Sequence, residues 1–177
     1  MKKSKNILKY LSSTKNYKTN YNGQGKIIAF TDSDFAGDIK DKKSTSGYII
    51  LISNNPIYCI SKKQSVVATS TTEAEYISTS QCIKKLLWIR NILFELIIFN
   101  KPITSFIDNN SCKISMENGD LNPKLKQISI KYHFNADNIR KNINELKHKK
   151  FKNLVETLTK VVNGNKMKSF INITFNN

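Results

Sequence analysis

The sequence predicts an α/β domain in which helices pack on a mixed β-sheet. One long segment, residues 70–97, has apolar residues at the three- and four-residue spacing of an amphipathic helix. A short strand-like run at 26–31 and a hairpin at 47–60 precede it, and a further run at 101–107 follows it. A strand, a hairpin, a long helix and another strand, in that order, are typical of a mixed sheet that contains a βαβ crossover.

The start of the long helix is marked by two overlapping capping-box patterns. Ser70 is followed three residues later by Glu73, and Thr72 by Glu75. In each pair, the hydroxyl and the carboxylate can satisfy free backbone amides of the first turn. Only one acid is needed for this purpose. Because Glu75 has apolar neighbours in the sequence, a carboxylate at that position indicates a cationic partner.

The other segments are short, and most have a recognisable pattern. The sequence favours a weakly amphipathic stretch at 6–12, a polar link through residue 25, a helix at 109–116, a loop at 118–123, helical spacing at 128–140, a weak strand at 144–148, a short helix at 153–162 and an unplaced strand-like pattern at 169–175.

Composition favours a basic domain with a phosphate-bearing partner. The 177 residues are enough for one hydrophobic core, and 29 basic against 13 acidic residues give a formal charge of +16. A Lys- and Asn-rich coding bias is the alternative source of this charge. The three cysteines, Cys59, Cys82 and Cys112, lack a CxxC spacing, which argues against a disulfide framework or a zinc site and indicates a reducing compartment.

Several other classes of protein are disfavoured by the sequence. No apolar run near the N-terminus has the length of a signal peptide core, and the run at 92–99 is far shorter than the ~20 residues that span a bilayer. We therefore expect neither secretion nor a membrane partner. The histidines, His133 and His148, lack the context of a nucleophile turn, and the chain has no glycine-rich phosphate loop in a strand-to-helix context.

Three acidic residues are predicted to converge. Asp32 and Asp108 follow two strands that a right-handed crossover makes parallel neighbours, and Glu75 lies in the first turns of the connecting helix. Three carboxylates repel one another unless hard divalent cations lie among them, and Mg²⁺ is the natural candidate. Taken singly, each acid has a structural alternative, with Asp32 as a turn residue, Asp108 as a helix N-cap and Glu75 as a capping-box acid.

Five stretches of the sequence carry a family resemblance. They are TDSDFAGD (31–38), KKSTSGY (42–48), SKKQSVVATSTTEAEY (61–76), LLWIR (86–90) and DNNS (108–111). Together they resemble the ribonuclease H (RNase H) domain at the C-terminal end of copia-type retrotransposon Pol polyproteins. The resemblance begins near Ile7 and continues to about Lys160.

The resemblance implies an RNase H-like mixed β-sheet with packed helices. Residues 1–25 would be the tail of the connection from the reverse transcriptase, 26–160 the RNase H-like domain and 161–177 a C-terminal extension. The implied partners are an RNA/DNA hybrid and the remainder of the Pol polyprotein. The implied location is the cytoplasm, in a virus-like particle, or the nucleus.

The resemblance also implies the site and its reaction. The family cuts the RNA strand of a hybrid with two Mg²⁺ ions roughly 4 Å apart, with Mn²⁺ as a possible substitute. Asp32 would bridge both ions, while Glu75 and Asp108 would each help to hold one. Glu156 takes the place of the fourth acid. Four lysines are implied as phosphate contacts, with solvated surface charge as the alternative: Lys42, Lys43, Lys62 and Lys63.

The sequence departs from the family pattern after residue 118. The family's ADILTK reads VETLTK, so Glu156 replaces an Asp, and TKHIDVRYH reads LKQISIKYH, so Gln127 and Ser129 replace a His and an Asp. The segment ELKHKKFKN lacks a Pro-Thr turn. We interpret the chain as a fragment or degenerate copy. Two functions stay open: an active ribonuclease H, and a catalytically weak or inactive remnant that only binds nucleic acid. An unrelated basic architectural protein is a third, which predicts no inward-facing acid cluster.

Overall fold

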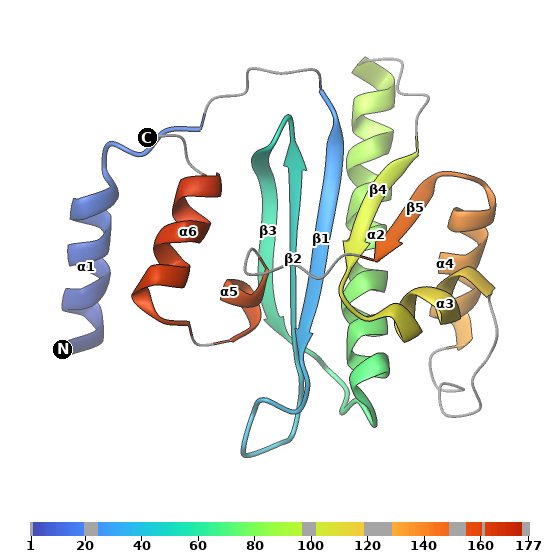
Figure 1. The fold of residues 1–177 in the computed structure, drawn as a ribbon, viewed down its shortest axis with the longest axis horizontal. Helices are drawn as coiled ribbons and strands as arrows, with labels where there is room; N and C mark the ends of the chain where they lie inside the picture. The colour runs from blue at the N-terminus through green and yellow to red at the C-terminus, as the bar shows by residue number, and fades with distance from the viewer. Residues whose placement is uncertain are drawn as a thin grey trace.

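The fold is built on one five-stranded mixed sheet with strand order β3-β2-β1-β4-β5 (Figure 1). The computed structural model describes residues 2–19, 25–96, 102–118, 129–148, 155–160 and 162–174. The first three strands pair antiparallel, while β1, β4 and β5 run parallel. The strands are β1 (Ile27–Asp34), β2 (Thr45–Ile52), β3 (Asn55–Lys63), β4 (Ile103–Ile107) and β5 (Asn144–His148).

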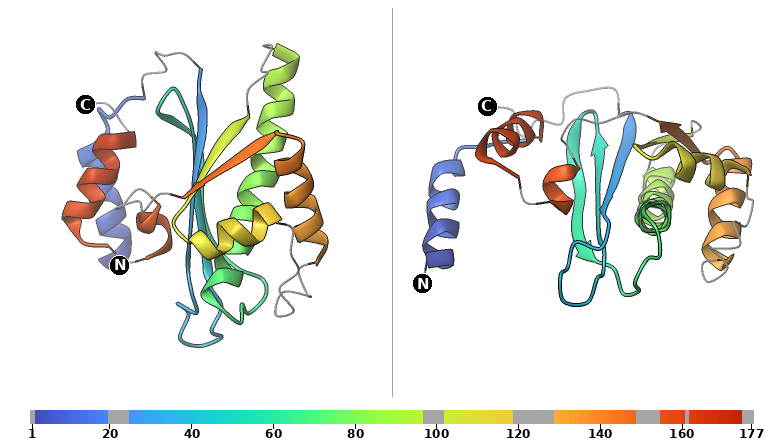
Figure 2. Two further views of the ribbon diagram at one scale, coloured as in Figure 1. Left: turned by 45° about the vertical axis from the view of Figure 1, so that its right-hand side comes forward. Right: turned by 60° about the horizontal axis from the view of Figure 1, so that its bottom comes forward.

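Helices cover both faces of this sheet. Figure 2 shows α2, α3 and α4 on one side, with α5 and α6 on the other and α1 beyond them. The helices are α1 (Lys2–Thr14), α2 (Thr71–Leu96), α3 (Asn110–Asn118), α4 (Ser129–Arg140), α5 (Glu156–Thr159) and α6 (Gly164–Thr174). No helix in the described part of the chain combines the length and the hydropathy that a membrane span requires.

Alternation along β1 divides the core between the two faces. Ala29 packs with Cys82 and Leu86 of α2, whereas the next residue, Phe30, packs with Val155 beside α5. Successive side chains of a strand point to opposite faces, so one strand supports both layers. This two-sided burial fixes the register of β1 and therefore the place where its acidic end emerges.

The fold predicted from sequence is confirmed, with two corrections near the C-terminus. The strand-like pattern at 169–175 is wrong, because α6 occupies residues 164–174. The adjacent residues Phe170 and Ile171 are both at least partly buried, whereas neighbours on a strand point to opposite faces. The short helix expected at 153–162 is only α5, four residues long. Residues 119–123 of the predicted loop at 118–123, and Gln127, lie outside the described residues.

Candidate metal centre

Three carboxylates meet at one end of the parallel strands. Asp32 is near the end of β1, Asp108 directly follows β4, and Glu75 is the fifth residue of α2. One oxygen or the other from each group lies within 4.8 Å of the other two. The parallel register pairs Phe30 with Phe106, so two residues further on both strands deliver an acid to the same edge. The predicted convergence is present in the structure.

The structure excludes the purely structural role that the sequence left open for each of these acids. Glu73 is the capping acid of α2: its Oε2 accepts from the backbone and hydroxyl of Thr69, at 2.6 Å each, and its own amide donates to Ser70 Oγ. Asn109 Oδ1 accepts from Cys112 N at 3.0 Å and so caps α3. Asp32 lies inside β1, paired with Gly47, and is not a turn residue.

Glu75 carries the clearest sign of a cation-binding site. Its Oε1 accepts a hydrogen bond of 3.0 Å from Ser33 N, whereas its buried Oε2 accepts none within the described residues. Burial, followed by the charges of Asp108 and Asp32, raises the pKa of Glu75 to about 8. A buried carboxylate oxygen without a partner is costly. A divalent cation bound among the three acids would remove that cost.

Asp32 and Asp108 have different surroundings. Burial, and then the charge of Asp32, raise the pKa of Asp108, while the ammonium of Lys160 opposes this shift. Asp32 accepts a hydrogen bond from the hydroxyl of Thr159, and Lys160 Nζ lies 3.8 Å from Asp32 Oδ2. The central acid therefore has both a neutral donor and a cation beside it.

The short helix α5 reaches Asp32 because β2 has a glycine opposite it. A Cβ atom on Gly47 would lie 2.5 Å from Thr159 Cγ2 and 3.2 Å from Leu158 Cβ. Only the absence of a side chain lets the helix approach the strand this closely. Ser78 of α2 closes the other side, donating to the carbonyl of Asp32 at 2.8 Å. The strand end is held from both faces of the sheet.

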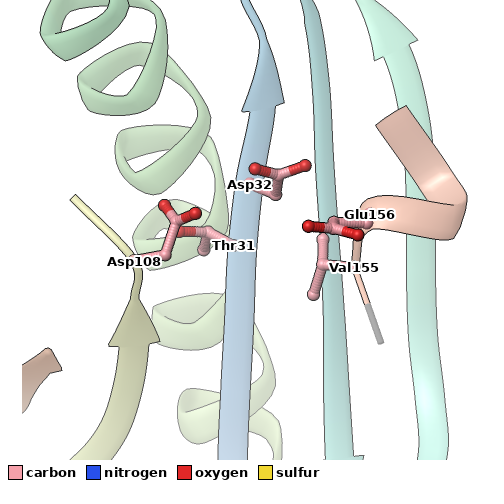
Figure 3. Close-up of a pocket in the computed structure, with 5 residues that line it drawn as sticks. All are labelled: Thr31, Asp32, Asp108, Val155 and Glu156. Atoms are coloured by element: carbon pink, nitrogen blue, oxygen red, sulfur yellow. The ribbon is translucent and has the colours of Figure 1, made fainter. Parts of the chain in front are cut away.

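Glu156, at the start of α5, is near the cluster without being one of its three members. It lines a small pocket together with Thr31, Asp32, Asp108 and Val155 (Figure 3). In this view Asp32 lies between Asp108 and Glu156. The charge of Glu156 also contributes to the raised pKa of Asp108.

A wider, open groove extends from the cluster across the ends of β1, β4 and β5. Besides the acids, it is lined by Asp34, Phe35, Thr71, Asn109, His148 and Lys160. The Nε2 atom of His148 lies 3.0 Å from the carbonyl oxygen of Asp108. The sequence analysis assigned no role in the site to Thr159 or Lys160, although both stand in the VETLTK segment that matched the family motif.

The predicted phosphate contacts lie at the same end of the sheet as the acids. Lys62 and Lys63 pair with Ser46 and Thr45, which in turn pair with the end of β1. Two strand spacings, about 10 Å, therefore separate them from β1. Lys63 is ion-paired with Asp38 at 2.5 Å and Asp41 at 2.8 Å. The other two, Lys42 and Lys43, belong to the loop between β1 and β2.

The donor set fits a hard divalent cation. Three carboxylates supply only oxygen ligands, which Mg²⁺ and Mn²⁺ prefer, and the unpartnered oxygen of Glu75 is available to one. Ordinary ion pairs do not neutralise the cluster, because Lys160 is the only described cation paired with any of its members. The arrangement suggests a divalent metal site. It also contradicts the interpretation as an unrelated architectural protein, which predicts no acid cluster.

Comparisons with known proteins agree with this geometry. No protein-family model matches the sequence. The chain is 35% identical over 162 residues, 90% of its length, to the retrovirus-related Pol polyprotein from transposon TNT 1-94 of Nicotiana tabacum. It is 33% identical over 171 residues, 94% of its length, to that from transposon RE1 of Arabidopsis thaliana. In both cases the chain spans only 12% of the relative.

The structural comparison concerns the fold alone. The crystal structure of LC11-RNase H1 in complex with an RNA/DNA hybrid matches with a TM-score of 0.52, at 17% identity, covering 76% of this chain and 94% of that one. The similarity in sequence and the similarity in fold are two separate findings, and both agree with the strand order described above. Over about nine tenths of its length the chain is therefore similar to copia-type retrovirus-related Pol polyproteins, and it has an RNase H-like fold.

Proposed function

We propose that this domain hydrolyses the RNA strand of an RNA/DNA hybrid with Mg²⁺, for which Mn²⁺ can substitute. The observation that carries the proposal is the cluster of Asp32, Glu75 and Asp108, with its unpartnered Glu75 oxygen. The similarity to a ribonuclease H1 solved with a hybrid supports the choice of substrate. The net positive charge of the chain would attract a polyanionic substrate, and the acid cluster would bind the metal ions that catalyse its cleavage.

The residues would divide the work by position. Asp32, at the centre, would bridge two ions, while Glu75 and Asp108 would each help to hold one and Glu156 would supply the fourth acid. The bound metals would activate a water and stabilise the leaving oxygen. Ser33 N fixes the Glu75 carboxylate, and Thr159 fixes that of Asp32. Lys42, Lys43, Lys62 and Lys63 would bind phosphates of the hybrid.

The wider assignment of the chain is also a proposal. Residues 1–25 would connect to a preceding reverse transcriptase, 26–160 would form the RNase H-like domain, and 161–177 would extend it. The remainder of a Pol polyprotein would be the protein partner, because the relatives are much longer than the chain. We place the reaction in the cytoplasm, within a virus-like particle, or in the nucleus.

A second candidate function is a remnant that binds hybrids without cutting them. The observation that favours it is Glu156, which carries an extra methylene relative to Asp and lies outside the three-acid cluster. Octahedral Mg²⁺ tolerates little error in ligand position. Such a remnant would bind nucleic acid in a salt-sensitive manner and show no turnover.

Cleavage of a labelled hybrid in Mg²⁺ and in Mn²⁺ tests the two functions. We expect cleavage by the wild-type chain and its loss in Asp32→Asn, with Asp137→Asn as the control because Asp137 pairs with Lys141 on the exposed side of α4. An intact hybrid across a range of both metals contradicts the enzyme. If Glu156→Asp then gains activity, the change at this position is the cause of the loss.

A further inference from the structure

Lys160 is a cation in a site that otherwise gathers acids. Its side chain is 46% exposed and reaches into the open groove, where Nζ lies 3.8 Å from Oδ2 of Asp32, a side chain that is only 7% exposed. Its charge also favours ionisation of Asp108. Among the described residues that line this groove, it is the only lysine or arginine.

The backbone of Lys160 is anchored, whereas its side chain is not. Its amide donates to the carbonyl of Glu156 at 2.9 Å and closes α5, and the preceding Thr159 is held between Asp32 and Gly47. The Lys160 side chain as a whole is 46% exposed, and the 3.8 Å between its Nζ and Asp32 Oδ2 is long for an ion pair. The structure thus fixes where the side chain starts and leaves its ammonium free to move within reach of the cluster.

A divalent cation on Asp32 would change the partner of this ammonium. Without metal, Lys160 offsets part of the repulsion among the acids. One divalent cation leaves the three ionised acids with a net charge of −1, and two leave them with +1, so metal binding first weakens and then reverses the attraction of an ammonium a few ångströms away. The nearest acceptor of opposite charge is then a phosphate of whatever polyanion the metal ions hold in the groove.

We propose that Lys160 is a substrate-contacting residue that pairs with Asp32 in the metal-free site and turns to a phosphate of the bound strand once divalent cations occupy the three-acid cluster. This inference rests on the proposed function for the identity of the strand. It adds a phosphate contact at the acids themselves, whereas the lysines expected from sequence lie on β3 and in the β1–β2 loop. The alternative is a structural role, in which Lys160 only ties α5 to β1.

The first test measures Mn²⁺ binding to the full chain without nucleic acid, by the electron paramagnetic resonance of free Mn²⁺. Removing a competing cation should tighten binding, so we expect Lys160→Gln to bind Mn²⁺ about threefold to tenfold more tightly than wild type. Lys160→Arg, which keeps the charge, should resemble wild type. The matched control is Lys141→Gln, which also removes one Lys–Asp pair, 2.7 Å long, with no member in the cluster.

The second test measures hybrid binding in Ca²⁺ at several salt concentrations by fluorescence anisotropy. Loss of one phosphate contact should lower the slope of log affinity against log salt by about one unit in Lys160→Gln. Lys141→Gln should leave the slope unchanged. If Lys160 had only a structural role, its replacement would weaken hybrid binding without lowering the salt slope, because only a phosphate contact releases counterions.

The inference is overturned if Lys160→Gln binds Mn²⁺ no more tightly than the wild type does. It is also overturned if the salt slope of Lys160→Gln equals that of Lys141→Gln. Lys160→Met, which keeps most of the unbranched length of the side chain, provides a second neutral variant if Lys160→Gln does not fold. Neither measurement requires cleavage. A chain that cuts nothing but shows both effects keeps this inference and loses the enzyme, and a chain that cuts without them does the reverse.

Discussion

Two glutamates two positions apart on α2 have opposite roles. Glu73 makes hydrogen bonds within its own helix start, where it satisfies Thr69. Glu75 turns to β1, accepts from Ser33 N and keeps one oxygen unpartnered in the described structure. Two residues correspond to a rotation of about 200° around a helix, so the two side chains point in different directions. This geometry separates the capping acid from the candidate metal ligand.

Glu75 should make the metal-free protein less stable at high pH. Its pKa in the folded state, about 8, lies above the ordinary value of 4.5, so the folded chain binds this proton more tightly than the unfolded chain. The stability that this proton provides is complete below about pH 4.5 and is lost as the pH rises through about 8. We expect the free energy of unfolding to fall by up to about 1.4 kcal/mol per pH unit in this interval.

Urea unfolding in the presence of a chelator, at a series of pH values, measures this dependence. In Glu75→Gln the decline should be much smaller, because the amide does not titrate and only the raised pKa of Asp108 still contributes. Saturating Mg²⁺ should reverse it in the wild type, since the metal binds the ionised carboxylate. An equally steep decline in Glu75→Gln would assign the titration to another group.

At the scale of elements, the site depends on how closely α5 packs on β2. The contact occurs at Gly47, where any side chain would meet Thr159 and Leu158. Val155, just before α5, belongs to the cluster on the same face of the sheet as Phe30. Because α5 has only four residues, its position comes from this packing and not from its own helical stability.

Gly47→Ala should displace α5 while the sheet persists. The new Cβ, 2.5 Å from Thr159 Cγ2, forces the helix outward, which removes the Thr159 hydrogen bond to Asp32 and moves Glu156 from the pocket. We expect Mn²⁺ affinity to fall about tenfold and stability to fall by about 1–3 kcal/mol, as for other overpacked sites.

The matched control is Gly164→Ala, because a Cβ at Gly164 meets no atom within 4 Å. Circular dichroism reports whether the fold persists, and Mn²⁺ titration reports the site. Equal Mn²⁺ affinity in Gly47→Ala and wild type would show that α5 does not support Asp32.

At the scale of the whole molecule, a strongly basic chain contains a cluster of three acids. The chain carries a formal charge of +16, yet its three clustered acids have one paired cation, Lys160, among the described residues. Such a distribution attracts a polyanion over the surface and retains divalent cations at one point. Apart from Lys160, nucleic-acid binding and metal binding would therefore depend on different residues and be separable by mutation.

Replacing Lys42, Lys43, Lys62 and Lys63 by Gln tests this separation. We expect the slope of log hybrid affinity against log salt to fall by about two to three units, less than four because Lys63 already pairs with Asp38 and Asp41. Mn²⁺ affinity should change little, since none of the four pairs with the acid cluster among the described ion pairs.

A second quadruple variant controls for the change in net charge. It replaces the lysines of α1 and the residues after it: Lys5, Lys9, Lys15 and Lys18. This set removes the same charge from α1 and the residues after it, and α1 lies beyond α6 from the sheet (Figure 1). If both quadruple variants lower the slope equally, binding reflects net charge alone and the predicted contacts are not specific.

The sequence alone determined the sheet, its crossover and the meeting of Asp32 with Asp108, because alternation and strand order are local patterns with few topological solutions. It also located Glu75 near them. It could not decide which glutamate caps α2, since both fit the capping pattern equally well. That choice depends on the direction of each side chain against β1, which exists only in the folded chain.

The C-terminal third was decided by tertiary structure. The pattern at 169–175 fits a strand or a helix, and packing of Phe170 on the core selects the helix. Thr159 and Lys160 reach Asp32 from more than 120 residues away, through the space that Gly47 leaves open. No local pattern encodes a contact of that kind, because it depends on the close approach of two backbones that only the completed sheet brings together.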